Sequence, residues 1–124
     1  LAQQLNASMG GVASNGLDPE PVDLGVGGIT NQNQDMGTFK APSLLNIAVT
    51  APYMHDGRFK TLEEVIDHYS DGVNFENPNI HPQMAAHGGQ QLNLTQQQKE
   101  DLLAFLKSMT DSSFLVNPAY ANPF

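Results

Sequence analysis

Hydrophobic residues recur with a helical period in two stretches of the chain. The first stretch predicts a helix over residues 61–70, because its apolar positions follow one another at spacings of three and four. Thr61 and Glu64 form a capping-box pattern, which marks the start of this helix. The residues expected on its buried face are Leu62, Val65, Ile66 and Tyr69.

The second periodic stretch predicts a helix over residues 96–109. Thr95 and Gln98 repeat the capping-box pattern at its start. The residues expected on its buried stripe are Leu102, Phe105, Leu106 and Met109.

The rest of the chain lacks such periodicity. We expect residues 1–36 to form an irregular arm or loop, residues 71–94 a second loop, and residues 112–124 an extended tail. Residues 37–60 combine turn formers with apolar residues and predict an ordered loop. Its expected buried anchors are Leu44, Ile47, Val49 and Tyr53. The fold class is therefore mostly α with long loops, and two helices enclose so little core that we expect a missing partner.

Composition narrows the function. The 124 residues carry a formal net charge of −8 with only five Lys and Arg, which argues against binding to nucleic acid or to an anionic membrane surface. The absence of cysteine removes disulfides, thiolate metal sites and covalent haem attachment from this chain. No apolar run reaches the length of a membrane span. The chain begins with Leu1, and we expect a processed or trimmed polypeptide.

Two adjoining segments carry a specific signature. Residues 39–46 read Phe-Lys-Ala-Pro-Ser-Leu-Leu-Asn, and residues 50–57 read Thr-Ala-Pro-Tyr-Met-His-Asp-Gly. Together with the helix starting at Thr61 and the helix after Thr95, they resemble the C-terminal part of bacterial di-haem cytochrome c peroxidases and MauG-type enzymes. The resemblance covers residues 36–111. It implies that residues 37–111 are the C-terminal portion of a cytochrome-c-like haem domain lacking C-x-x-C-H.

The resemblance also implies a function. The chain would be part of a di-haem c-type peroxidase or MauG-like oxidase that uses hydrogen peroxide, and it would not be active alone. Its partners would be a segment or subunit that carries the haem c, and an electron donor or protein substrate; the location would be periplasmic or otherwise exported. The alternatives are a non-catalytic subunit that packs on a haem protein, and a fragment of an electron-transfer cytochrome.

The resemblance assigns its most specific role to Tyr69. MauG-type enzymes place a tyrosine at this position as the distal axial ligand of a haem, where the peroxidases place methionine. A phenolate is a hard anionic donor that stabilises ferric iron, so the chemistry is consistent. Periodicity alone favours the alternative that Tyr69 is a core residue on the apolar face of its helix.

His55 corresponds to the family's loop histidine near the haem edge, and by this resemblance we expect it to be the catalytic residue. Its expected role is a hydrogen bond to a propionate or a water; the alternative is an exposed histidine in a turn. Met54 is expected to pack rather than to bind iron. Leu45 stands where the family usually has arginine, which puts one expected polar contact in doubt.

Three of the five basic residues, Lys40, Arg58 and Lys60, lie close together in the sequence. Haem propionates are anionic, so we expect Lys40 and Arg58 to contact them; the alternative is ordinary solvated charge. By resemblance alone, the backbone carbonyls of Thr50 and Pro52 would bind a calcium ion, for which carbonyl oxygen is a suitable ligand. The three remaining histidines are too dispersed for a metal site and are expected at the surface: His68, His81 and His87.

Overall fold

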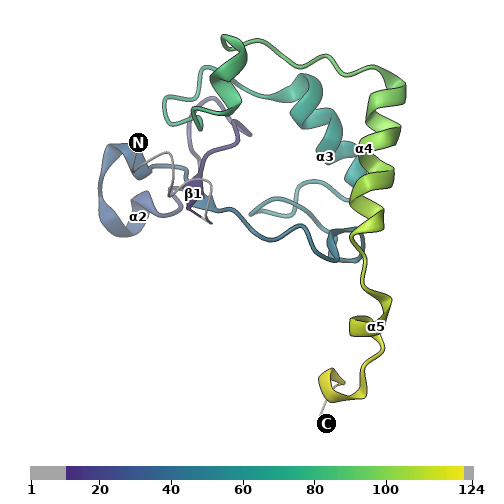
Figure 1. Ribbon diagram of the computed structural model, residues 1–124. Helices are drawn as coiled ribbons and strands as arrows, with labels where there is room; N and C mark the ends of the chain where they lie inside the picture. Colours follow the sequence, from purple (N-terminus) through teal and green to yellow (C-terminus); the bar gives the residue numbers. More distant parts are fainter. Residues whose placement is uncertain (1–10, 122–124) are drawn as a thin grey trace.

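The protein is described here by a computed structural model of residues 11–121, apart from the side chains of residues 86 and 87. It is a small domain in which helices and a two-stranded sheet are joined by long loops (Figure 1). The α-helices are α2 (Gly27–Thr30), α3 (Leu62–Asp67), α4 (Gln96–Ser108) and α5 (Ser112–Leu115). Strands β1 (Val12–Ala13) and β2 (Phe39–Lys40) pair antiparallel, with Val12 opposite Lys40. The expected helices and long loops are thus present, and the cytochrome-c-like architecture stays a prediction.

Short helical turns interrupt the loops. The 3-10 turns are η1 (Asn33–Asp35), η2 (Ile47–Val49), η4 (Met84–His87) and η5 (Pro118–Tyr120). A single π-helical turn, η3 (His68–Gly72), follows α3 directly. The described part of the expected arm therefore contains β1, α2 and η1, and the segment expected to be extended at the C-terminus contains α5 and η5.

Both predicted helices, α3 and α4, begin where the capping boxes predict. The Thr61 hydroxyl accepts a hydrogen bond from the Glu64 N–H at 3.2 Å, and the Glu64 carboxylate accepts one from the Thr61 N–H at 3.0 Å. Thr95 and Gln98 form the same reciprocal pair at the start of α4. These bonds satisfy N–H groups that the first turn leaves without partners, so each start is fixed by local sequence.

The core is small and lies between α3 and α4. Leu62, Ile66 and Leu106 are buried there. The partly buried residues packed against them are Ile47, Ala48, Tyr53, Leu103 and Met109. On the surface above this core, the Lys99 ammonium lies 2.7 Å from the Asp67 carboxylate and 2.9 Å from that of Asp71, which ties the start of α4 to the end of α3 and to η3.

Several expected anchors are not buried. Leu44 and Val49 are 43% and 53% exposed, and Phe105 is 57% exposed. In α4 the face toward α3 runs through Leu103 and Leu106, so Phe105 lies to one side of the contact. Periodicity identifies an apolar stripe, but the neighbouring helix covers only part of its width.

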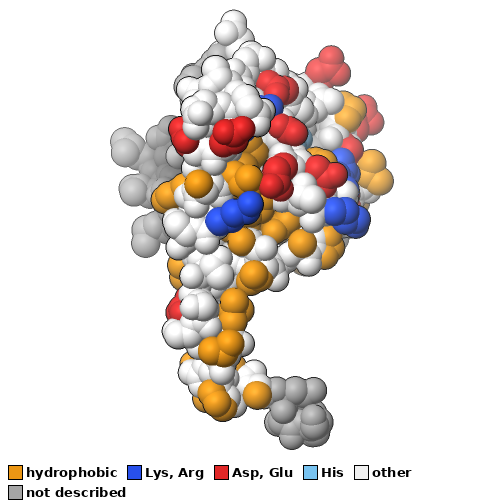
Figure 2. All heavy atoms as spheres, turned by 90° about the vertical axis from the view of Figure 1, so that its right-hand side faces the viewer, with side chains coloured by type: hydrophobic (Ala, Val, Ile, Leu, Met, Phe, Trp, Pro, Cys, Tyr) orange, Lys and Arg blue, Asp and Glu red, His pale blue; other side chains and the backbone are white. Residues whose placement is uncertain are grey.

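The uncovered apolar side chains continue along one side of the molecule. Figure 2 shows hydrophobic side chains on the α4 side and along the C-terminal segment, which projects away from the body of the domain. In that segment, the exposed large side chains are Phe114, Leu115, Val116 and Tyr120. None of the helices in the described residues is long and apolar enough to cross a bilayer.

The small core makes stability sensitive to its central residue. Ile66→Ala should lower the free energy of unfolding by roughly 2–5 kcal/mol, because it removes a buried side chain and leaves a cavity between α3 and α4. Ile29→Ala is the matched control, since Ile29 is 84% exposed, and it should change stability by less than about 0.5 kcal/mol. Chemical denaturation measures both; equal effects would contradict this assignment of the core.

Candidate functional site

One short segment before α2 is held to several distant parts of the chain. We call residues 14–18 the strap. Each of its five carbonyl oxygens has a hydrogen-bond partner: His81 N–H to Ser14 (3.0 Å), His68 Nε2 to Asn15 (3.0 Å), Asn74 N–H to Gly16 (2.8 Å), Arg58 Nη1 to Leu17 (3.4 Å) and Asn77 Nδ2 to Asp18 (2.9 Å). The strap is therefore fixed along its whole length.

The path of the strap requires a glycine. Gly16 has φ of +65°, in the left-handed region that side chains disfavour. A Cβ there would lie 2.9 Å from the Asn74 carbonyl oxygen and 3.0 Å from a Val73 methyl carbon. The backbone can approach residues 73–74 this closely only because Gly16 has no side chain.

The strap places the Asn15 side chain beside Tyr69. Asn15 Nδ2 lies 3.4 Å from the Tyr69 hydroxyl oxygen and 3.3 Å from the Met54 sulfur. Tyr69 is partly buried in η3, and its ring meets that of His68 edge-on at a centroid distance of 5.3 Å. The phenol oxygen, the thioether and the amide therefore converge on one location.

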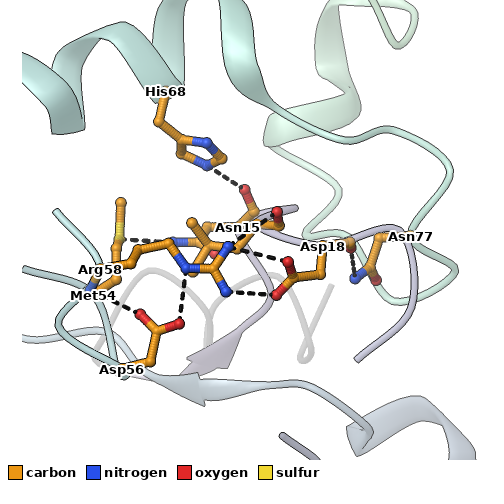
Figure 3. A network of polar contacts seen from close by, with 8 residues as sticks. Asn15, Asp18, Met54, Asp56, Arg58, His68 and Asn77 are labelled. Atoms are coloured by element: carbon orange, nitrogen blue, oxygen red, sulfur yellow. Dashed lines mark hydrogen bonds and ion pairs between the residues drawn. The ribbon is translucent and has the colours of Figure 1, made fainter. Parts of the chain in front are cut away.

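His68 is buried, and the expectation that it lies at the surface is wrong. It is 7% exposed, and its Nε2 contacts the Asn15 carbonyl oxygen (Figure 3). A carbonyl only accepts hydrogen bonds, so Nε2 carries the proton. Burial lowers the pKa of His68, which favours the neutral imidazole. The helix pattern missed this contact because the covering residue belongs to the distant strap. His81 is partly buried, and the His87 side chain lies outside the described part of the structure.

Arg58 joins the strap to the loop that precedes α3. Its guanidinium contacts both Asp18 carboxylate oxygens, at 3.1 and 2.8 Å, and the Asp56 carboxylate at 2.8 Å (Figure 3). The hydrogen bond from Arg58 holds the pKa of Asp18 below its usual range, and the two carboxylates raise the pKa of Arg58. Although burial opposes it, the same guanidinium also keeps the pKa of Asp56 low. The Arg58 guanidinium, which we expected to contact a haem propionate, is therefore already paired with two carboxylates.

His55 lies on another side of the strap. Its ring stacks on Phe39 with centroids 3.8 Å apart and planes 10° from parallel. The two rings line a cavity of about 20 Å³ together with Asn15, Asp18 and Asn77. That volume is sufficient for about one water molecule among polar groups. The geometry is compatible with the expected hydrogen bond between His55 and a water.

The other expected site residues are more dispersed. Lys40 is exposed on β2, and Lys60 donates to the Gly57 carbonyl oxygen at 2.8 Å. Thr50 and Pro52 are exposed in the loop after η2. Within the described residues, no cluster of three or more His, Cys, Asp or Glu side chains forms a metal site, so an ion at Thr50 and Pro52 would depend on carbonyl oxygens.

The structure thus brings Tyr69, Met54 and Arg58 to one strap, with His55 across it. Sequence reasoning missed Asn15 and Asp18, because they lie in a segment without periodicity. The glycine at position 16 was the available local signal, since it marks unusual backbone but not the partner of that backbone.

The Asp18–Arg58 pair should make stability depend on acid. The folded state holds the pKa of Asp18 below the unfolded value, so its stabilising effect is complete above pH of about 4 and is lost as the pH falls through the folded pKa. Asp18→Asn should remove on the order of 1 kcal/mol at neutral pH and flatten the loss below pH 4. Thermal unfolding between pH 7 and 3 measures this, with Glu20→Gln as an exposed control. Parallel pH profiles for wild type and Asp18→Asn would contradict the role of the pair.

Comparison with known proteins identifies relatives of this chain. The chain is 34% identical over 99 residues to the cytochrome-c peroxidase IdrP1 of Pseudomonas sp. strain SCT, covering 77% of this chain and 24% of that protein. It is 34% identical over 119 residues to the methylamine utilization protein MauG of Paracoccus denitrificans, covering 82% of this chain and 30% of that protein. No family model matches the chain.

A solved structure agrees with these relatives. A MauG-like protein associated with microbial copper homeostasis superposes with a TM-score of 0.73 at 42% identity, over 90% of this chain and 38% of that one. The chain spans about a quarter of the length of the curated relatives that it matches. These relationships confirm the resemblance found in the sequence, and the chain belongs to the family of cytochrome-c peroxidases and MauG proteins.

Proposed function

We propose that this chain forms part of a haem pocket in a di-haem c-type peroxidase or MauG-like oxidase, with Tyr69 as the distal axial ligand of a haem c attached outside the chain. The observation that carries the proposal is the phenol oxygen of Tyr69. It lies at a fixed position on η3, partly buried, and its hydrogen-bond partner within the described residues is the Asn15 amide at 3.4 Å. A single long hydrogen bond leaves lone pairs on that oxygen for a metal.

The residues around Tyr69 fit a haem ligand but not a haem attachment. The phenol is flanked by the Met54 sulfur and the His68 ring, which give it a partly apolar surrounding. The chain has no cysteine, so the covalent links must come from another segment. Bound haem would supply oxidation by hydrogen peroxide, and Tyr69 would hold and tune its iron with an anionic oxygen.

The basic residues and His55 take supporting roles in this proposal. Lys40 is exposed and free to approach a propionate, whereas Arg58 would contact one only alongside its two carboxylate partners. His55 would hold a water or a propionate through its imidazole, next to the small polar cavity. We regard Lys40 as the better anion contact because, among residues 11–121, no carboxylate pairs with it, whereas two pair with Arg58.

A haem-bearing partner is supported by the surface. The exposed apolar side chains of α4 and the C-terminal segment are typical of a surface that another polypeptide covers. We propose that the covering partner is the haem-bearing portion found in full-length relatives, either as a separate chain or as a continuous one. An exported, periplasmic location follows from the proposed c-type haem.

Tyr69→Phe tests the proposed ligand directly. In the haem-bearing assembly, loss of the phenol oxygen should change the axial ligation of one ferric haem, because phenylalanine has no donor atom. Electron paramagnetic resonance and the visible absorption spectrum measure this. Tyr53→Phe is the matched control, since the Tyr53 hydroxyl donates to the Ile47 carbonyl oxygen at 2.8 Å and is not proposed as a ligand. Unchanged spectra for Tyr69→Phe would exclude the ligand role and leave a packing subunit or an electron-transfer fragment as the remaining functions.

Calcium binding through Thr50 and Pro52 is a separate proposal. Both residues are exposed, and no hydrogen bond to either carbonyl oxygen is found within the described residues. Removal of calcium with a chelator should lower the unfolding temperature of the assembly, and calcium should restore it better than magnesium, which demands a smaller octahedral site. Thermal unfolding followed by circular dichroism measures this. An unfolding temperature insensitive to the chelator would contradict the proposal.

A further inference from the structure

We propose that Asn15 is a positioning residue for Tyr69, whose side-chain amide donates a hydrogen bond to the phenol oxygen and sets both its direction and its electron donation toward haem iron. This inference rests on the proposed role of Tyr69 as the ligand. It assigns to Asn15, a residue of the strap that is distant from Tyr69 in the sequence, an influence on the ligand atom.

The orientation of the Asn15 amide follows from its two neighbours. The same nitrogen lies 3.3 Å from the Met54 sulfur and 3.4 Å from the Tyr69 oxygen. A thioether sulfur only accepts hydrogen bonds, so the group that faces it must be the NH₂ and not the carbonyl oxygen. The two N–H groups of one amide are therefore divided between Met54 and Tyr69.

The amide is held in place from both sides. His68, which precedes Tyr69 in η3, binds the backbone carbonyl of Asn15, so the two residues are joined by main-chain and side-chain contacts at once. On the other side, Met54 has φ of +69°. L-residues seldom adopt this left-handed conformation, and with it the loop brings the Met54 sulfur to 3.3 Å from the amide nitrogen.

The expected effect on iron follows from the charge on the oxygen. A phenolate accepts a stronger and shorter hydrogen bond than a phenol, so the 3.4 Å contact should shorten when Tyr69 binds iron. The donated bond withdraws electron density from the phenolate and weakens its stabilisation of ferric iron. Loss of the bond should therefore favour ferric over ferrous iron and lower the midpoint potential.

Two substitutions test this in the haem-bearing assembly. Asn15→Ala removes the amide but keeps the carbonyl that His68 binds, so the strap stays anchored. It should shift the ferric–ferrous equilibrium about tenfold toward ferric iron, which is about 59 mV for one electron. Asn15→Asp keeps the size of the side chain, removes the donor and adds negative charge, so it should lower the potential further.

The controls separate tuning from structure. Asn33→Ala, at an exposed position in η1, should leave the potential unchanged. In a Tyr69→Phe background, Asn15→Ala should have no further effect on the potential, because the oxygen on which it acts is gone. Loss of stability alone would not reproduce that dependence.

The outcomes distinguish this inference from the proposed function. If Tyr69→Phe changes the axial ligation while both Asn15 variants keep the wild-type potential, Asn15 has no such role and the ligand assignment stands. If Tyr69→Phe leaves the ligation unchanged, both proposals fail. A potential lowered by both Asn15 variants, only when Tyr69 is present, supports both.

Discussion

Hydrogen bonding to the carbonyl groups of the strap is the constraint on which the site depends. The apolar cluster between α3 and α4 is limited to a few side chains and contains no residue of the strap; the buried apolar residue beside the strap is Val73, next to Gly16. Hydrogen bonds contribute about 0.5–1.5 kcal/mol each, so a continuous row of them can hold a segment that lies outside this cluster. The row draws its donors from the loop before α3, from η3 and from residues 74–81, and so fixes these regions relative to one another.

This arrangement explains why Tyr69 is neither a core residue nor a surface residue. Its helix buries Leu62 and Ile66 against α4, while the strap covers His68 and approaches the phenol. Tyr69 lies between the apolar contact on one side and the polar contact on the other. A side chain in such a position holds its oxygen at a defined place, and the oxygen is not fully buried.

Local features were predictable from the sequence, and long-range polar contacts were not. The helix starts at Thr61 and Thr95 were predictable because a capping box involves only residues within one turn. The family signature at residues 39–57 pointed to Tyr69 and His55, whose roles remain predictions. The burial of His68 depended on Asn15, which no period or motif connects to it. Leu44 and Phe105 were expected to be buried, but the described residues cover each of them only in part.

The π-helical turn η3 extends α3, so that one helical segment contacts both α4 and the strap. A π turn contains an extra residue compared with an α turn, so the side chains that follow fall out of phase with those before it. His68 and Ser70 are the buried residues of η3, and Tyr69 is its second residue. The extra residue of the π turn therefore displaces the chain that follows the phenol, whereas the phenol itself keeps the phase of α3 and stays beside the strap.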